Sequence, residues 1–329
     1  TRCTSRVAST IFSFTRRETR RVGVTMRLAV ASNILRAPAR SRAVTMRATQ
    51  RTIVDAHVHV WPDASTFAYE EGKTPPCAGS HDRLIEEMDA NGVRACLIVQ
   101  PINLGFDHAY VDEAVRAHPG RFVGMALANP ASESGTEDLR ESLASGTFRG
   151  ARFNPALWPE GEGMDGEVGK RMFRACAEAT PPAVVGFMCF HGLHLHLDAI
   201  RALCAYEPRT PVLIDHFGFT KGVDDENFDK LLQLGRDFKQ VNVKCSAHFR
   251  VRVETEDGAD STRAQLDRLL EVYGPDRLLW GSDYPFVTME EGGYAGAVAV
   301  LGEQLACDPE VLAKIRGDNF LRLFPGALD

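Results

Sequence analysis

The chain has 329 residues, and 44% of them are hydrophobic, so it is long enough to bury a large core. Its formal net charge of −6 argues against nucleic-acid binding, because contacts with phosphates need a cationic surface. It contains no apolar run of about 18 residues, so we expect no membrane-spanning segment.

Residues 1–51 differ in composition from the rest of the chain. They hold twelve arginines, no lysine and a single acid, Glu18, which gives a net charge of about +11. A segment rich in Arg, Ser and Thr and almost free of acids is typical of an organellar transit peptide. We therefore expect residues 1–51 to be a disordered transit peptide and residues 52–329 to fold as one domain. The alternative is a basic arm that contacts nucleic acid or a membrane.

Eight cysteines are scattered along the chain without a C-x-x-C pair, and several lie in apolar stretches. This pattern predicts buried, reduced thiols, with no disulfide bridges and no structural zinc.

From residue 52 onward, short apolar runs alternate with segments of helical periodicity. The predicted strands are 53–58, 93–99, 121–127, 149–153, 183–190, 211–215, 241–245 and 277–281. The helical segments between them have clear ends, such as Ser80 before "HDRLIEEMDA" and Asn91-Gly92 after it. Eight such units predict an α/β fold, the (β/α)8 or TIM barrel. The rival fold, an open doubly wound sheet, usually has a Gly-rich turn after its first strand, and none occurs here.

A barrel of this kind builds its active site at the carboxyl ends of its strands, so those ends identify the candidate residues. His57 and His59 share one face of the first strand and point into the barrel mouth. His216 follows the sixth strand and Asp283 follows the eighth. Three imidazoles and a carboxylate can hold a divalent cation, or the carboxylate can act as a free base on water. Asp215, beside His216, is expected to be structural.

Other strand ends carry groups suited to anions or polar substrates. Arg152 and Asn154 lie at the end of the fourth strand, and Lys244 and Arg250 lie at the end of the seventh. The planar fork of an arginine suits a bidentate carboxylate, and pairing with a loop acid is the alternative. Gln100, after the second strand, is expected either to orient a substrate or to close a turn.

Strand five is followed by His191, His194 and His196. His194 and His196 are expected at the start of the next helix. Only His191 lies near the strand end, which makes it a candidate metal ligand.

The ordered set "DAHVHVW", "LIVQPIN", "ARFNP", "VLIDHFG", "NVKCSAHFRV" and "RLLWGSDYPF" resembles the amidohydrolase-related barrel proteins. That family includes pyrone dicarboxylate lactonase and the aminocarboxymuconate semialdehyde decarboxylase type. With its Arg-rich leader, the chain is similar to a plant and algal branch, which implies a chloroplast location, or alternatively a mitochondrial one.

The resemblance implies that His57, His59, His216 and Asp283 face one another. The chain departs from binuclear members because strand four has no lysine that could be carbamylated to bridge two metals. Some members complete a metal site with a histidine on strand five, for which His191 is the candidate here. Pyrone lactonase-like members work without metal, so the resemblance implies either one divalent ion, zinc or manganese, or none.

We therefore expect a hydrolase that acts on a small carboxylated lactone or ester. In this hypothesis Asp283 activates water, the histidines stabilise the oxyanion, and Arg152 and Arg250 hold a substrate carboxylate. The alternatives are a metal-dependent non-oxidative decarboxylase and an inactive barrel that binds a small anion. The expected partner is a small molecule rather than nucleic acid or a membrane, and the sequence leaves a homodimer open.

Overall fold

A computed structural model describes residues 52–253, 261–304 and 308–329 of the chain. The predicted transit peptide, residues 1–51, lies outside the described residues. Within them, eight parallel strands pair in sequence order, and a bridge between Val58 and Tyr284 joins the first strand to the segment after the eighth. The strands are β1 (Ile53–Val58), β2 (Val93–Val99), β3 (Phe122–Leu127), β4 (Phe148–Phe153), β5 (Val184–Phe187), β6 (Val212–Ile214), β7 (Val241–Ser246) and β8 (Leu278–Gly281).

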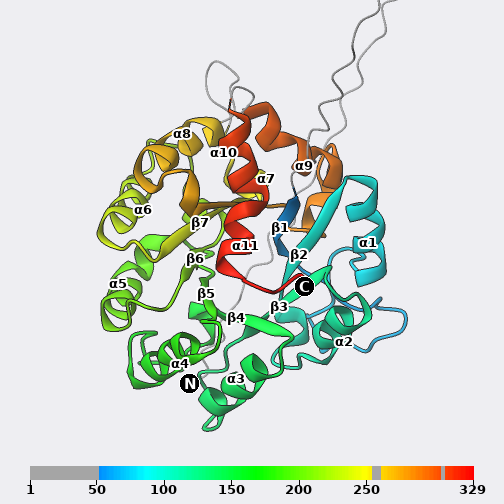
Figure 1. Ribbon diagram of the computed structural model, residues 1–329. Helices are drawn as coiled ribbons and strands as arrows, with labels where there is room; N and C mark the ends of the chain where they lie inside the picture. Colours follow the sequence, from blue (N-terminus) through cyan, green and yellow to red (C-terminus); the bar gives the residue numbers. More distant parts are fainter. Residues whose placement is uncertain (1–51, 254–260, 305–307) are drawn as a thin grey trace, which may run out of the picture. The chain divides into compact units, whose positions relative to one another are not determined.

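The predicted (β/α)8 barrel is therefore confirmed, with helices around the outside of the strands (Figure 1). The main helices are α1 (His81–Ala90), α2 (Ala109–Ala117), α3 (Gly135–Ala144), α4 (Glu167–Glu178), α5 (Leu197–Tyr206), α6 (Glu226–Asp237), α8 (Ser261–Tyr273) and α9 (Gly293–Gln304). Shorter helices are α7 (His248–Val251), α10 (Pro309–Ala313) and α11 (Asn319–Leu323). Among the described helices, none is both long and apolar enough to cross a bilayer.

The predicted end of the fifth strand is wrong, because β5 stops at Phe187 instead of running to residue 190. Met188 and Phe190 are apolar, but they line a cavity at the barrel mouth instead of pairing with β6. Apolar character alone therefore does not separate a buried strand from a cavity wall.

The core has two layers, one between the strands and the outer helices and one inside the barrel. The inner layer includes strand residues that face into the barrel, such as Val54 and Val123. Three residues near the C-terminus of the chain pack against them: Phe320, Leu323 and Phe324. These strand residues lie near the starts of β1 and β3, and α11 lies across that end of the barrel (Figure 1). Because the amino ends of the strands are closed in this way, the carboxyl ends are left to form the site.

Candidate active site

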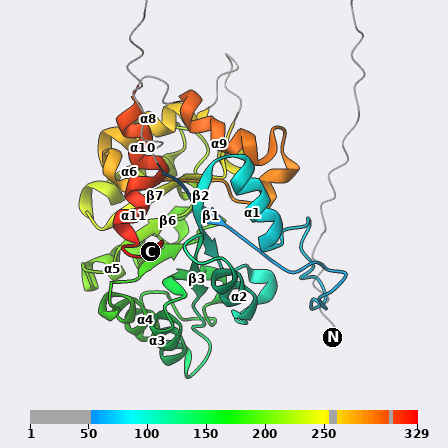
Figure 2. The ribbon, with the colours of Figure 1, turned by 45° about the vertical axis from the view of Figure 1, so that its right-hand side comes forward.

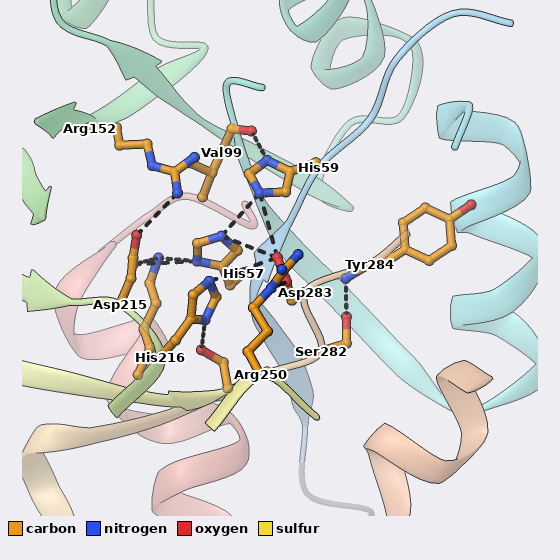
Figure 3. A network of polar contacts seen from close by, with 12 residues as sticks. His57, His59, Val99, Arg152, Asp215, His216, Arg250, Ser282, Asp283 and Tyr284 are labelled. Atoms are coloured by element: carbon orange, nitrogen blue, oxygen red, sulfur yellow. Dashed lines mark hydrogen bonds and ion pairs between the residues drawn. The ribbon is translucent and has the colours of Figure 1, made fainter. Parts of the chain in front are cut away.

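Four residues that the sequence singled out converge at the carboxyl ends of β1, β6 and β8 (Figure 3). Oδ1 of Asp283 lies 3.8 Å from Nε2 of His57, 3.6 Å from Nε2 of His59 and 3.8 Å from Nε2 of His216. All four side chains are buried. One carboxylate oxygen therefore faces three imidazole nitrogens at distances too long for direct hydrogen bonds.

The backbone that carries these groups is constrained. His216 and Asp283 adopt left-handed φ angles of 51° and 64°. The left-handed conformation is energetically unfavourable for residues other than glycine, and such conformations occur most often at functional sites. Hydrogen bonds hold the turn, because the Asp283 amide donates to the His57 carbonyl at 2.9 Å and the Ser282 amide donates to Oδ1 of Asp55 at 2.9 Å.

Asp55 is a functional position that sequence reasoning missed. Its Oδ1 also accepts a hydrogen bond from the His57 amide at 3.1 Å, so one buried carboxylate ties β1 to the segment after β8. Burial raises the pKa of Asp55 to about 6. The spacing in "DAHVH" was the available signal, but it does not give the geometry. The register of β1 with β2 breaks between Asp55 and Val58, and Asp55 pairs with Cys96, which belongs to the core layer between the strands and the helices.

Contacts behind the imidazoles orient the rings. Nδ1 of His59 lies 2.8 Å from the Val99 carbonyl, which can only accept, so His59 donates there and Nε2 presents a lone pair to Asp283. Nδ1 of His216 lies 2.8 Å from the Ser246 hydroxyl. Burial lowers the pKa of both histidines, that of His59 to about 3, so both rings are neutral at physiological pH.

His57 rests on a buried ion pair. Nζ of Lys244 lies 3.1 Å from Nδ1 of His57 and 3.1 Å from Oδ1 of Asp215. Burial by itself would raise the pKa of Asp215, but the charges of Lys244 and Arg152 outweigh it and the pKa is lowered. Asp215 is thus an anion that supports the site, in agreement with the structural role expected for it.

Lys244 was expected among the substrate ligands, but the structure places it elsewhere. Its side chain has no exposed surface, and it lies beneath His57 rather than in the lining of the cavity. Its contacts with His57 and Asp215 account for its burial.

The site opens into a cavity of about 220 Å³. It is lined by His59, Trp61, Pro101, Ile102, Asn103, Arg152, Met188, Phe190, His216, Phe219, Arg250, Asp283 and Phe286. Much of this wall is aromatic or aliphatic, and the polar groups that face it converge on Asp283. Such a mixture is typical of a site that takes one small molecule in a fixed orientation.

Two positively charged side chains, Arg152 and Arg250, line this cavity, as the sequence suggested. Nε of Arg250 donates to Oδ2 of Asp283 at 2.6 Å, while its guanidinium lies 4.6 Å from the centre of the Phe286 ring. Arg152 is 6% exposed and approaches Asp215 at 3.6 Å, and its Nε is buried without a hydrogen-bond partner in the described part of the chain. Arg152 therefore has donor capacity left for an anionic ligand.

Three other candidates do not join the cluster. The side-chain amide of Gln100 donates to the carbonyls of Gly105 and Asp107, which is the turn-closing role, and Oδ1 of Asn154 accepts from the Ala156 amide. His191 is exposed in a turn with its ring against Phe190, and the structure does not bring it into the cluster of His57, His216 and Asp283. Of the five residues expected to bind the substrate, Arg152 and Arg250 line the cavity.

Asp283 has the properties of a general base. Burial raises the pKa of its carboxyl to about 7, against the opposing charge of Arg250. A carboxyl with a pKa near the working pH combines a useful fraction of the ionised form with appreciable basicity. Opposite it, His59 presents the lone pair of its Nε2.

The same donor atoms fit a single divalent ion. Ligand atoms of His57, His216 and Asp283 lie within 4.8 Å of one another, and His59 is not part of this set although its Nε2 lies 3.6 Å from Oδ1 of Asp283. Imidazole nitrogen with one carboxylate oxygen is a donor set that suits zinc, and a mixed nitrogen and oxygen set also accepts manganese. Coordination by His57 requires its proton on Nδ1, for which Asp215 offers an acceptor at 3.4 Å.

Comparison with known proteins agrees with this geometry. Residues 54–326 match the family model described as amidohydrolase. A 4-sulfomuconolactone hydrolase of Rhizobium radiobacter is 30% identical over 290 residues, which cover 82% of this chain and 89% of the relative. A 2-pyrone-4,6-dicarboxylate hydrolase of Comamonas testosteroni is 26% identical over 289 residues, which cover 82% and 89%.

Among solved structures, a putative 2-pyrone-4,6-dicarboxylic acid hydrolase from Pseudomonas putida superposes with a TM-score of 0.70 at 26% identity. The match covers 83% of this chain and 97% of that one. Since the family match spans nearly all of the described barrel and contains every member of the His and Asp cluster, the chain belongs to the amidohydrolase family.

Proposed function

We propose that the protein hydrolyses a small lactone or related ester that carries an anionic group. The observation that carries the proposal is the arrangement of Asp283. Its Oδ1 faces three imidazole Nε2 atoms at 3.6–3.8 Å, while its Oδ2 is held by Arg250 at 2.6 Å. Relatives named as lactone hydrolases support the assignment.

In the reaction that we propose, Asp283 takes a proton from water, and the water oxygen forms a bond to the lactone carbonyl carbon. His57 donates from Nε2 to the carbonyl oxygen as negative charge develops on it. The ring C–O bond then breaks, and the proton held by Asp283 passes to the leaving oxygen. The products are a hydroxyl group and a carboxylic acid, which loses its remaining proton to solvent. A divalent ion held by the His and Asp cluster would supply polarisation of the carbonyl and acidification of water.

Arg152 and the aromatic wall position the substrate in this proposal. The unpaired donor of Arg152 suits a carboxylate or sulfonate. Trp61, Phe219 and Phe286 cover the ring and keep bulk water away from the reacting carbon.

The experiment that tests the function uses the full chain with a panel of lactones, with and without a carboxylate, in water enriched in ¹⁸O. Hydrolysis places one ¹⁸O atom in the newly formed carboxylate of the ring-opened product. Release of carbon dioxide without ¹⁸O incorporation would identify the decarboxylase alternative instead. Binding of the carboxylated lactones without turnover would identify a binding protein. The exposed Asp198→Asn variant on α5 serves as the matched control for Asp283→Asn.

The transit peptide, the chloroplast location and the homodimer stay predictions from the sequence. We propose that residues 1–51 direct the protein to the plastid. Fusion of these residues to a fluorescent protein tests this, because a mitochondrial or diffuse signal would contradict it.

A further inference from the structure

A second group of metal-ligating side chains lies outside the barrel, away from the candidate active site. His81 and Asp82 are the first two residues of α1, and His118 follows the last residue of α2. Nδ1 of His81 lies 3.2 Å from Nε2 of His118, and Oδ1 of Asp82 lies 3.3 Å and 3.7 Å from these two nitrogens. The two helices lie on the same side of the barrel in both views (Figures 1 and 2).

These separations match those of a tetrahedral zinc site. Zinc binds histidine nitrogen and carboxylate oxygen at about 2.0–2.2 Å, so ligand atoms at tetrahedral corners lie roughly 3.3–3.6 Å apart. The three measured separations, 3.2, 3.3 and 3.7 Å, cluster around that range. A single hydrogen bond between the imidazoles explains the separation of the two nitrogens, but it does not require a carboxylate close to both.

The two imidazoles are held in place by their neighbours. Ser80 caps α1 by accepting a hydrogen bond from the Arg83 amide, which fixes the turn that carries His81. The His81 ring lies 5.4 Å from the ring of Tyr110, and the His118 ring lies 5.2 Å from that of Phe122. Pre-ordered ligands lose little conformational entropy when an ion binds.

The three proposed ligands differ in how far their side chains are exposed to solvent. The side chains of His81 and His118 are 14% and 24% exposed, whereas that of Asp82 is 78% exposed. Two partly buried nitrogens thus form the base of the site, and the exposed carboxylate closes it from the solvent side.

We propose that His81, Asp82 and His118 bind one zinc ion with water in the fourth position, and that this ion links α1 to α2. The cysteine pattern indicated no structural zinc, and this site uses no cysteine. Because the ion binds the folded chain, it should raise the melting temperature. The proposal does not depend on the hydrolase function.

The test is a zinc titration of the chelator-treated full chain, by calorimetry, with wild type, His118→Asn and Asp82→Asn. The matched control is His191→Asn, which removes an exposed histidine outside both groups. We expect wild type and His191→Asn to bind one more zinc per chain than His118→Asn. We expect Asp82→Asn to weaken that additional site at least tenfold, since one of its three ligands is lost. Zinc should raise the melting temperature of the wild type by several degrees more than that of His118→Asn.

Equal zinc stoichiometry and affinity in wild type and a folded His118→Asn variant would overturn the proposal. Circular dichroism establishes whether that variant is folded. Should His118→Asn fail to fold, Asp82→Asn decides, because its exposed side chain can change without disturbing the core. Unchanged zinc affinity in that variant would also overturn the proposal.

Discussion

The ammonium of Lys244 lies 3.1 Å from Nδ1 of His57, and neither side chain is exposed to solvent. An ammonium can only donate a hydrogen bond, so Nδ1 of His57 accepts and the proton of the neutral ring sits on Nε2. Nε2 of His57 in turn lies 3.3 Å from the Nε2 lone pair of His59. Lys244 therefore determines that His57 presents a hydrogen-bond donor toward His59 and Asp283.

This contact predicts that Lys244 opposes metal binding by His57. In Lys244→Gln, His57 can carry its proton on Nδ1 and donate it to Asp215, which frees Nε2 to coordinate. Loss of a buried positive charge beside the cluster acts in the same direction. We expect zinc affinity at the cluster to rise at least tenfold, in line with the size of effects from residues behind metal ligands. Competition with a chromogenic chelator in a His118→Asn background isolates this site.

The matched control is Lys230→Gln on the exposed face of α6. Unchanged or weaker zinc binding by a folded Lys244→Gln variant would show that Lys244 does not control the His57 tautomer. The same variant should lose lactone turnover in the presence of chelator, because His57 no longer donates to the carbonyl oxygen.

Asp283→Asn should remove the proposed base while preserving the fold. The amide is close in size to the carboxylate, and asparagine tolerates the left-handed φ of 64° at this position. We expect turnover to fall by roughly 10²–10⁴, the contribution typical of general base catalysis, with a much smaller change in KM. Steady-state kinetics on a confirmed lactone measures the effect, and Asp198→Asn should behave as wild type. Retention of more than a tenth of wild-type turnover would exclude Asp283 as the base.

The pH dependence of kcat/KM should follow the ionisation of Asp283. Burial raises the pKa of Asp283 to about 7, and only the ionised form can accept a proton from water. Activity should therefore fall about tenfold per pH unit below that value. The charge of Arg250 lowers this pKa, so Arg250→Gln should shift the acidic side of the pH profile to higher pH. The variant Arg236→Gln, at an exposed position, serves as control. An unshifted pH profile in Arg250→Gln would contradict the proposed ion pair between Arg250 and Asp283.

The fold was predictable because each strand is a short apolar run between helical segments. The sequence prediction of β1 and β2 matches both ends. The histidine pair and the residues after β6 and β8 were also predictable, because strand alternation and barrel geometry together place them at one mouth.

The depth of each side chain was not predictable. Lys244 and Ser246 share the inward face of β7, but Lys244 lies two residues, roughly 6–7 Å, further from the mouth. That difference puts Ser246 beside His216 and Lys244 beneath His57. The contact between His81 and His118 was likewise not predictable from the sequence, because the rotation of α1 relative to α2 depends on tertiary packing.

Arg152 is expected to recognise the anionic group of the substrate. Its side chain is buried at the cavity and its Nε lacks a hydrogen-bond partner among the described residues, so it can bind a carboxylate without giving up an existing bond there. Hydrogen bonds to charged groups contribute about 1.5–3 kcal/mol, so Arg152→Gln should raise KM roughly tenfold to a hundredfold for a carboxylated lactone. A matched lactone without the carboxylate should show little change. The control variant Arg149→Gln changes a partly buried arginine of β4 that does not line the cavity, and it should leave both substrates unaffected. Equal losses on the two lactones would mean that Arg152 supports the site through Asp215 instead of binding the substrate.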